Sequence, residues 1–142
     1  MSFNILVVDD SAVMRAMIIR TLKLSGLALG EIHEAANGEK ALAAVREHWI
    51  DLILADLNMP VMGGEEMMAR LKADEATRDV RVVVVSSESG EERIREIERR
   101  AAGFIHKPFT PEGIRAKITE VMGVSDDGQS GTSSLSDDSL DF

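Results

Sequence analysis

Short runs of apolar residues alternate along the chain with longer segments whose apolar positions repeat at helical spacing. The short runs are rich in Val, Ile and Leu, which is typical of parallel strands buried on both faces. The longer segments carry polar residues opposite an apolar stripe, as helices that cover a sheet do. The predicted strands span residues 3–8, 31–37, 51–56, 81–87 and 103–107, and the predicted helices span 11–25, 38–48, 65–73, 91–100 and 111–122.

Individual residues in this pattern predict helix ends and inward faces. Ser11 has the side chain expected of a helix N-cap. In the helix that follows it, Val13, Met17 and Leu22 are expected to belong to the apolar stripe. Trp49 is expected to pack at the end of the second helix.

The fivefold alternation of strand and helix predicts an α/β fold. Strands separated by helices of this length form a parallel sheet with right-handed crossovers and helices on both faces. We therefore expect a flavodoxin-like (βα)5 three-layer sandwich with strand order 2-1-3-4-5. In that order the first and third strands flank the topological switch point, where open α/β sheets bind ligands.

Four of the predicted strands end in side chains that phosphoryl chemistry can use. Because the carboxyl ends of parallel strands lie at one edge of the sheet, these side chains are expected to converge. In strand order they are Asp9 and Asp10, then Asp56, then Ser86 and Ser87, and finally Lys107 followed by Pro108.

Three carboxylates at one place repel each other, and a hard divalent cation relieves that repulsion. Mg²⁺ (or Mn²⁺) suits such a site because it takes one or two carboxylates, several waters and phosphate oxygens. Asp10 and Asp56 are candidate direct ligands, and Asp9 is a candidate ligand through water. The backbone carbonyl of Asn58 is a further candidate.

An aspartate can also act as a nucleophile and form an aspartyl-phosphate. In that chemistry a cation neutralises the transferring phosphoryl group, and the Lys107 ammonium with the Ser86 hydroxyl could hold its remaining oxygens. Together these residues predict a phosphoryl-transfer site.

Composition excludes several other classes of protein. The 142-residue chain has no Cys, so neither a disulfide nor a thiolate site is possible. A net charge of −9 disfavours nonspecific nucleic-acid binding. No apolar run reaches the roughly 20 residues that span a bilayer, and the N-terminus does not resemble a signal peptide. We therefore expect a cytoplasmic protein that binds neither nucleic acid nor membrane.

The last part of the chain differs from the rest. Residues 124–142 are rich in Ser, Asp and Gly, with five Asp and no basic residue. They contain too little apolar surface to offset the entropy of ordering. The predicted organisation is one folded domain at residues 1–123 and a disordered acidic tail at 124–142.

The strand-end motifs resemble those of a known family. VVDDS, DLNMPVMGG, VVVVSSES and HKPF occur in this order, and with them residues 3–123 resemble a response-regulator receiver domain, specifically the single-domain chemotaxis regulators of the CheY type. The resemblance implies that Asp56 is the phosphorylation site. It also implies that Asp9, Asp10 and the Asn58 carbonyl bind Mg²⁺ and that Lys107 contacts the phosphoryl group.

The same resemblance implies a switch beside the site. The Ser86 hydroxyl would turn toward the phosphoryl group, and Phe104, at the aromatic switch position, would move inward with it. The peptide bond between Lys107 and Pro108 is expected to be cis. Three flanking residues are expected to tune the site or leave room in it: Asn58, Ser87 and Glu88.

The function implied by the resemblance is a phosphorylation-activated signalling switch, not an enzyme. A histidine kinase would donate the phosphoryl group, and the expected partners are a flagellar switch protein or another downstream protein, with a phosphatase as a further candidate. A monomer is expected. The tail residues Leu135, Leu140 and Phe142 resemble acidic-hydrophobic docking peptides of such partners, and could fold back on the groove around Phe104.

Other functions remain open at this point. A stand-alone receiver could be a phosphorelay intermediate or a phosphate sink. A haloacid-dehalogenase-type phosphohydrolase also uses Asp and Mg²⁺, but it expects an acid two residues after the nucleophile, where this chain has Asn58. A flavodoxin would need a Ser/Thr-rich phosphate loop after the first strand, where this chain has acids.

Overall fold

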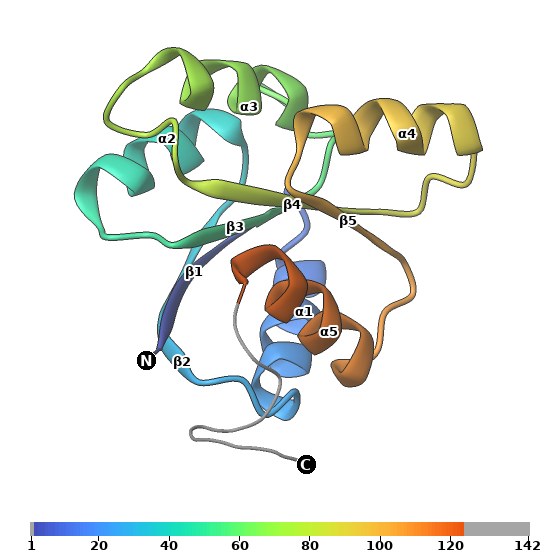
Figure 1. Cartoon of the computed structure of the whole chain (residues 1–142). Coiled ribbons are helices and arrows are strands. Elements are labelled where there is room, and N and C mark those ends of the chain that lie inside the picture. Colours follow the sequence, from blue (N-terminus) through green and yellow to red (C-terminus); the bar gives the residue numbers. More distant parts are fainter. Residues whose placement is uncertain (1, 124–142) are drawn as a thin grey trace.

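Five strands and five helices alternate along residues 2–123, the part of the chain that the computed structural model describes (Figure 1). The strands are β1 (Phe3–Val8), β2 (Leu29–Ala35), β3 (Leu52–Ala55), β4 (Arg81–Ser86) and β5 (Gly103–His106). The helices are α1 (Ala12–Leu24), α2 (Gly38–Glu47), α3 (Gly64–Ala73), α4 (Glu91–Arg100) and α5 (Pro111–Met122).

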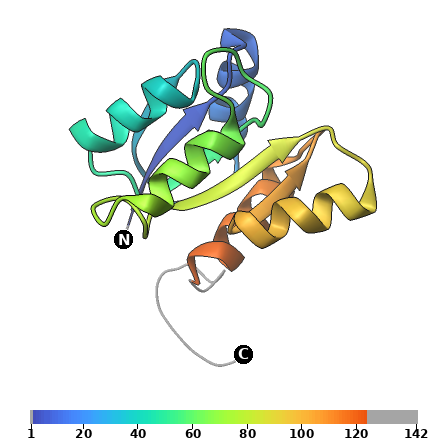
Figure 2. The ribbon, with the colours of Figure 1, turned by 90° about the horizontal axis from the view of Figure 1, so that it is seen from above.

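The strands form one parallel sheet in the order β2-β1-β3-β4-β5. Helices α2, α3 and α4 cover one face of this sheet, and α1 and α5 cover the other (Figures 1 and 2). The predicted flavodoxin-like three-layer fold is confirmed. In the interior strand β1, Val8 pairs with Ala35 of β2 on one side and with Ala55 of β3 on the other.

Alternate side chains of each central strand enter two separate cores, because successive residues of a strand point to opposite faces. Leu6 and Val8 of β1 belong to the core beneath α2, α3 and α4. Ile5 and Val7 belong to the core beneath α1 and α5. All four side chains are fully buried, which explains why the strands read as continuous apolar runs.

Two sequence predictions about helix packing are wrong. Val13 and Met17 of α1 are 72% and 52% exposed, and the residues that α1 buries are Ile18 and Leu22. The broad apolar stripe of this helix allows more than one inward face, and the position of the sheet selects one. Trp49 is 79% exposed and does not pack at the helix end.

The predicted element ends agree with the structure to within one residue, except at β2. This strand spans Leu29–Ala35, two residues earlier than the predicted 31–37. Asn37 instead caps α2, since its side chain accepts a hydrogen bond of 2.9 Å from the backbone N–H of Lys40. Ser11 caps α1 as predicted, by accepting from the N–H of Met14.

No helix within residues 2–123 is long and apolar enough to cross a membrane. The predicted acidic tail and the docking residues Leu135, Leu140 and Phe142 lie outside the described residues.

Candidate functional site

The carboxyl edge of the sheet holds the candidate site. The hydrogen-bond ladder continues one residue beyond the strands, since the N–H of Asp9 donates to the Ala35 carbonyl at 3.1 Å and that of Asp56 donates to the Val8 carbonyl at 3.0 Å. This pairing fixes the backbones of both aspartates to rigid strand ends. Their side chains therefore start from positions that the sheet determines.

Asp9, Asp10 and Asp56 form one cluster, in which a carboxylate oxygen from each lies within 4.8 Å of the others. Asp9 is buried (2% exposed), Asp56 is half-buried and Asp10 is exposed. Each of the two less exposed carboxylates accepts one backbone N–H: Asp9 from Ser11 at 2.9 Å, and Asp56 from Leu57 at 2.8 Å. The remaining oxygens form a compact, all-oxygen donor set of the kind that fits Mg²⁺.

Burial and the neighbouring acids both disfavour the ionised form of Asp9. Burial raises the pKa of Asp9 above its ordinary value, and the charges of Asp56 and Asp10 raise it further, against the opposing effects of the Ser11 N–H and Lys107. A bound cation would reverse this balance, because positive charge favours the ionised carboxylate.

Lys107 supplies a positive charge at the same place. Its Nζ lies 3.8 Å from Oδ2 of Asp9, with the Lys107 side chain mostly buried and that of Asp9 almost fully so. The Lys107–Pro108 peptide bond is cis, as expected. The sequence-predicted acids and lysine are thus brought together, although they come from the ends of β1, β3 and β5.

Ser86 lies at the buried end of β4, and its hydroxyl accepts a hydrogen bond of 3.0 Å from the N–H of Glu88. The Glu88 carboxylate in turn accepts from the N–H of Gly90, the residue that caps α4. Ser87 is exposed. A hydroxyl that turned away from Glu88 would therefore release the turn that leads into α4.

Phe104 of β5 is buried in the core beneath α2, α3 and α4, where Val84 and Ile97 also lie. Its ring centroid is 6.4 Å from that of His106 on the same strand. Phe104 also borders a groove between β5 and α5, together with His106, Pro108, Phe109, Gly113 and Lys117. Phe104 therefore belongs to the core and also lines a surface groove.

The loop between β3 and α3 shapes the site in a way that the sequence motif did not specify. The N–H of Gly64 donates to the Leu57 carbonyl at 2.9 Å, and a Cβ on Gly64 would lie 2.6 Å from the carbonyl oxygen of Asp56. Only a residue without a side chain fits there. Asn58 is exposed on this loop, and Val61 has a φ of 69°, in the left-handed region.

Arg15 belongs to the Met14-Arg15 pair that accompanies the VVDDS motif, and the structure gives it a positioning role that the sequence did not indicate. Its Nη1 donates to the backbone carbonyl of Asp9 at 2.6 Å, and its Nε donates to the Glu34 carboxylate at 2.8 Å. The arginine therefore links α1, β2 and the backbone at the aspartate cluster. Its place in the first turn of α1, just after the strand-end acids, is a signal that could have identified this role.

A family model described as "Response regulator receiver domain" matches residues 5–119. The chain is 37% identical over 123 residues to the phosphate regulon transcriptional regulatory protein PhoB of Escherichia coli, a match that covers 86% of this chain and 52% of that protein. The chain thus spans about half the length of PhoB.

Two further proteins are matched over nearly their whole length. A chemotaxis protein CheY homolog of Campylobacter jejuni is 32% identical over 122 residues, which is 84% of this chain and 92% of that protein. The solved structure of the chemotaxis response regulator CheY4 of Vibrio cholerae superposes with a TM-score of 0.74 at 31% identity, covering 85% of this chain and 99% of that chain.

Proposed function

This chain belongs to the response-regulator receiver family, and from that premise we propose that it is a switch in which a histidine kinase phosphorylates Asp56. The observation that carries the proposal is the convergence of three carboxylates within 4.8 Å of one another, with the Lys107 ammonium 3.8 Å from Asp9. A neutral ligand would gain little from such alternating charges, whereas a cation with a phosphoryl group would match them.

The residues present fit a divalent cation. Asp10, Asp56 and the Asn58 carbonyl would hold Mg²⁺ or Mn²⁺, with Asp9 acting through water. When bound, the metal supplies positive charge for the oxygens of the incoming phosphoryl group. Mg²⁺ favours such a set of oxygen ligands because it is a hard cation, and it usually keeps several waters beside one or two carboxylates.

The chain's own residues would carry out the transfer to Asp56. A carboxylate oxygen of Asp56 attacks phosphorus, and the bond from phosphorus to the imidazole nitrogen of the donor breaks. That nitrogen leaves with the electron pair and takes up a proton. Lys107 would neutralise a phosphoryl oxygen, and the Ser86 hydroxyl would donate a hydrogen bond to another.

The consequence of phosphorylation would be a changed surface. If the Ser86 hydroxyl turns to the phosphoryl group, its hydrogen bond with the Glu88 N–H is lost, and the segment before α4 is free to move. Phe104, buried under α4, couples this segment to the groove between β5 and α5. The product of the chemistry is thus an altered binding face, so we propose a cytoplasmic switch and not an enzyme.

Chemotaxis is the circuit that we propose for this switch, and a flagellar switch protein is the proposed partner. The similarity to a CheY homolog over nearly all of that protein supports this assignment. A phosphorelay role predicts something different: the phosphoryl group would pass from Asp56 to a second histidine-containing protein. Incubating the phosphorylated chain with a flagellar switch-protein peptide or with a histidine phosphotransfer protein separates the two roles.

Intact mass spectrometry after incubation with acetyl phosphate and MgCl₂ tests the phosphoacceptor. We expect one phosphoryl group on the wild type and none on Asp56→Asn. The matched control is Asp79→Asn, which changes an exposed acid just before β4, at the other end of that strand from Ser86, and should be modified like the wild type. An unchanged gain in Asp56→Asn would refute the assignment. Multiple turnover of a phosphomonoester would instead favour the phosphohydrolase.

A further inference from the structure

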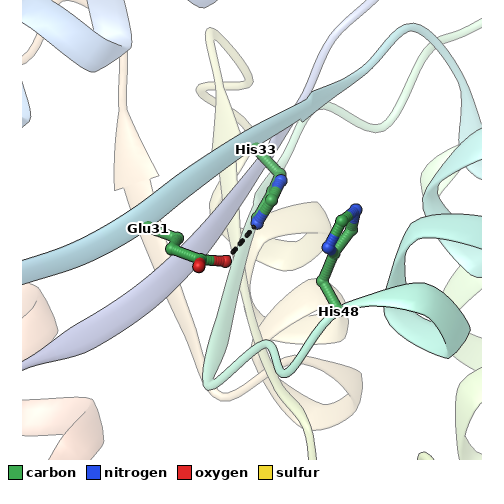
Figure 3. Close-up of side chains that lie close together, drawn as sticks. All are labelled: Glu31, His33 and His48. Carbon is green, nitrogen blue, oxygen red and sulfur yellow. Dashed lines mark hydrogen bonds and ion pairs between the residues drawn. The ribbon is translucent and has the colours of Figure 1, made fainter.

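A second group of potential metal ligands lies away from the phosphoacceptor site. Glu31 and His33 belong to the edge strand β2, and His48 follows directly after α2. Figure 3 shows the three side chains pointing into the same space. The two histidines are fifteen positions apart and share no local motif, so the sequence alone gave no indication of this cluster.

The three side chains lie close to one another. The Nε2 atom of His33 lies 2.9 Å from Oε1 of Glu31. The rings of His33 and His48 are stacked, with centroids 3.8 Å apart and planes inclined by 19°. One donor atom from each of the three residues lies within 4.8 Å of the others. Two residues apart on one strand, Glu31 and His33 necessarily point to the same face of the sheet.

This donor set differs in kind from the aspartate cluster. Two imidazoles and one carboxylate suit a borderline metal such as Zn²⁺, whereas Mg²⁺ prefers oxygen ligands alone. Ligand atoms about 2.0 Å from a tetrahedral Zn²⁺ lie about 3.3 Å from each other. The existing separation of 2.9 Å between His33 and Glu31 is near that spacing. The ring of His48 would turn out of its stack on His33 to direct a nitrogen lone pair at the same metal.

The site is open to solvent and carries additional negative charge. The side chains of Glu31, His48 and His33 are 68%, 39% and 23% exposed. The Glu47 carboxylate lies 3.9 Å from Nε2 of His48. A metal can therefore reach the cluster, with water or Glu47 completing its coordination.

We propose that Glu31, His33 and His48 form a zinc-binding site that joins the edge strand β2 to the end of α2. This site shares no residue with the phosphoacceptor site. Ala35, whose carbonyl accepts from the N–H of Asp9, marks the carboxyl end of β2, and Glu31 and His33 lie before it on that strand. The bound metal would replace the contact between His33 and Glu31 with shared coordination and would fix the position of His48.

Isothermal titration of the untagged full-length chain with ZnCl₂, in excess MgCl₂ to occupy the aspartate cluster, tests the proposal. We expect one equivalent of Zn²⁺ per chain. Affinity should fall at least about tenfold in His48→Gln and in His33→Gln, because even the loss of an outer-sphere partner weakens metal sites by 10–100-fold. His106→Gln is the matched control, since His106 is exposed on β5 and the chain has three histidines. It should bind like the wild type.

Imidazole NMR resonances of the unaltered protein give a second measurement that does not depend on a variant. Stoichiometric ZnCl₂ should shift the signals of His33 and His48 and leave those of His106 in place. The proposal is overturned if the wild type takes up no zinc beyond the aspartate cluster, or if His48→Gln retains full affinity. It is equally overturned if zinc binds only between two chains, with half an equivalent per chain. Phosphorylation of Asp56 should proceed in both histidine variants, so failure of one assignment does not imply failure of the other.

Discussion

The backbone N–H of Lys107 donates a hydrogen bond of 2.8 Å to the carbonyl oxygen of Ser86. This bond joins the ends of β5 and β4 directly at the candidate site. The ammonium group and the hydroxyl that would contact a phosphoryl group are therefore carried on the hydrogen-bonded ends of two neighbouring strands. A backbone shift at either residue would therefore displace the other, and the Ser86 hydroxyl also bonds to the turn before α4 through the N–H of Glu88.

Replacing Lys107 with Ala should separate metal binding from phosphoryl transfer. Mg²⁺ affinity should rise about fivefold or more, because unit charges about 4 Å apart interact by about 1 kcal/mol even in bulk water. Phosphorylation by acetyl phosphate should slow at least about tenfold, because the Lys107 ammonium no longer neutralises a phosphoryl oxygen. Calorimetry and mass spectrometry measure the two effects, with exposed Lys72→Ala as control. Weaker Mg²⁺ binding in Lys107→Ala would contradict this account.

Ser86→Ala should remove the response while leaving the phosphoacceptor intact. The Glu88 N–H loses its hydrogen-bond partner, so unfolding free energy should fall by about 1 kcal/mol. The variant should still gain a phosphoryl group. However, phosphorylation should produce much smaller NMR shift changes along residues 103–106 than in the wild type. Ser87→Ala, at an exposed neighbouring serine, should respond normally; equal responses in both variants would exclude the proposed role of Ser86.

Gly64→Ala should damage both stability and the site. The new methyl group would sit 2.6 Å from the carbonyl oxygen of Asp56, and we expect a loss of about 1–3 kcal/mol, as for other overpacked positions. Displacement of Asp56 should also slow its phosphorylation. Gly90→Ala is the control, because there the nearest atom is the flexible Glu88 carboxylate at 3.1 Å. Chemical denaturation compares the variants. A denaturation midpoint for Gly64→Ala equal to that of the wild type would contradict this prediction, because it would show that the loop accommodates the methyl group.

Val61→Asn should stabilise the protein. Val61 is exposed and has a φ of 69°, a conformation that is costly for a β-branched side chain and accessible to Asn. The expected gain is about 1 kcal/mol in unfolding free energy. Because the side chain is exposed, little packing is lost in exchange. Val13→Asn, at an exposed helical position, should not stabilise; a gain there of the same size would point to a surface effect and not to backbone strain.

The ion pairs between α3 and α4 should make stability depend on pH under acidic conditions. A hydrogen bond from Arg93, at 3.1 Å, lowers the pKa of Glu65 below its ordinary value of 4.5, and the charge of Arg100 acts in the same direction. A lowered folded-state pKa means that the stabilisation is complete above about pH 4.5 and is lost as the pH falls through the folded value.

Glu65→Gln should therefore be less stable than the wild type near neutral pH, and the difference should shrink as the pH falls below 4.5. Thermal unfolding over pH 3–7 measures this difference. Glu66→Gln is the control, because Glu66 pairs with Arg70 inside α3 and does not bridge to α4. A Glu65→Gln deficit that persisted unchanged at low pH would rule out the ion pair as its source.

The sequence by itself determined the order of elements, the flavodoxin-like class and the residues at the strand ends. Strands buried on both faces must be apolar throughout, so Asp9 and Asp56 stand out as the first polar residues after apolar runs, and Lys107 follows directly after the last strand. Their convergence then follows from parallel topology, because one edge of the sheet collects all the carboxyl ends. The positions of these residues could therefore be predicted from the apolar pattern of the strands and from the rule that parallel strands end at one edge of the sheet.

Only the tertiary structure decided which groups meet across elements. It turned Val13 outward, placed Glu65 beside Arg93, and brought His48 onto His33. Each outcome depends on the rotation of a helix about its axis and on its position over the sheet. Local periodicity restricts such rotations to a broad range, and long-range packing selects one of them. The aspartate cluster could therefore be predicted from the sequence, whereas the histidine cluster could not.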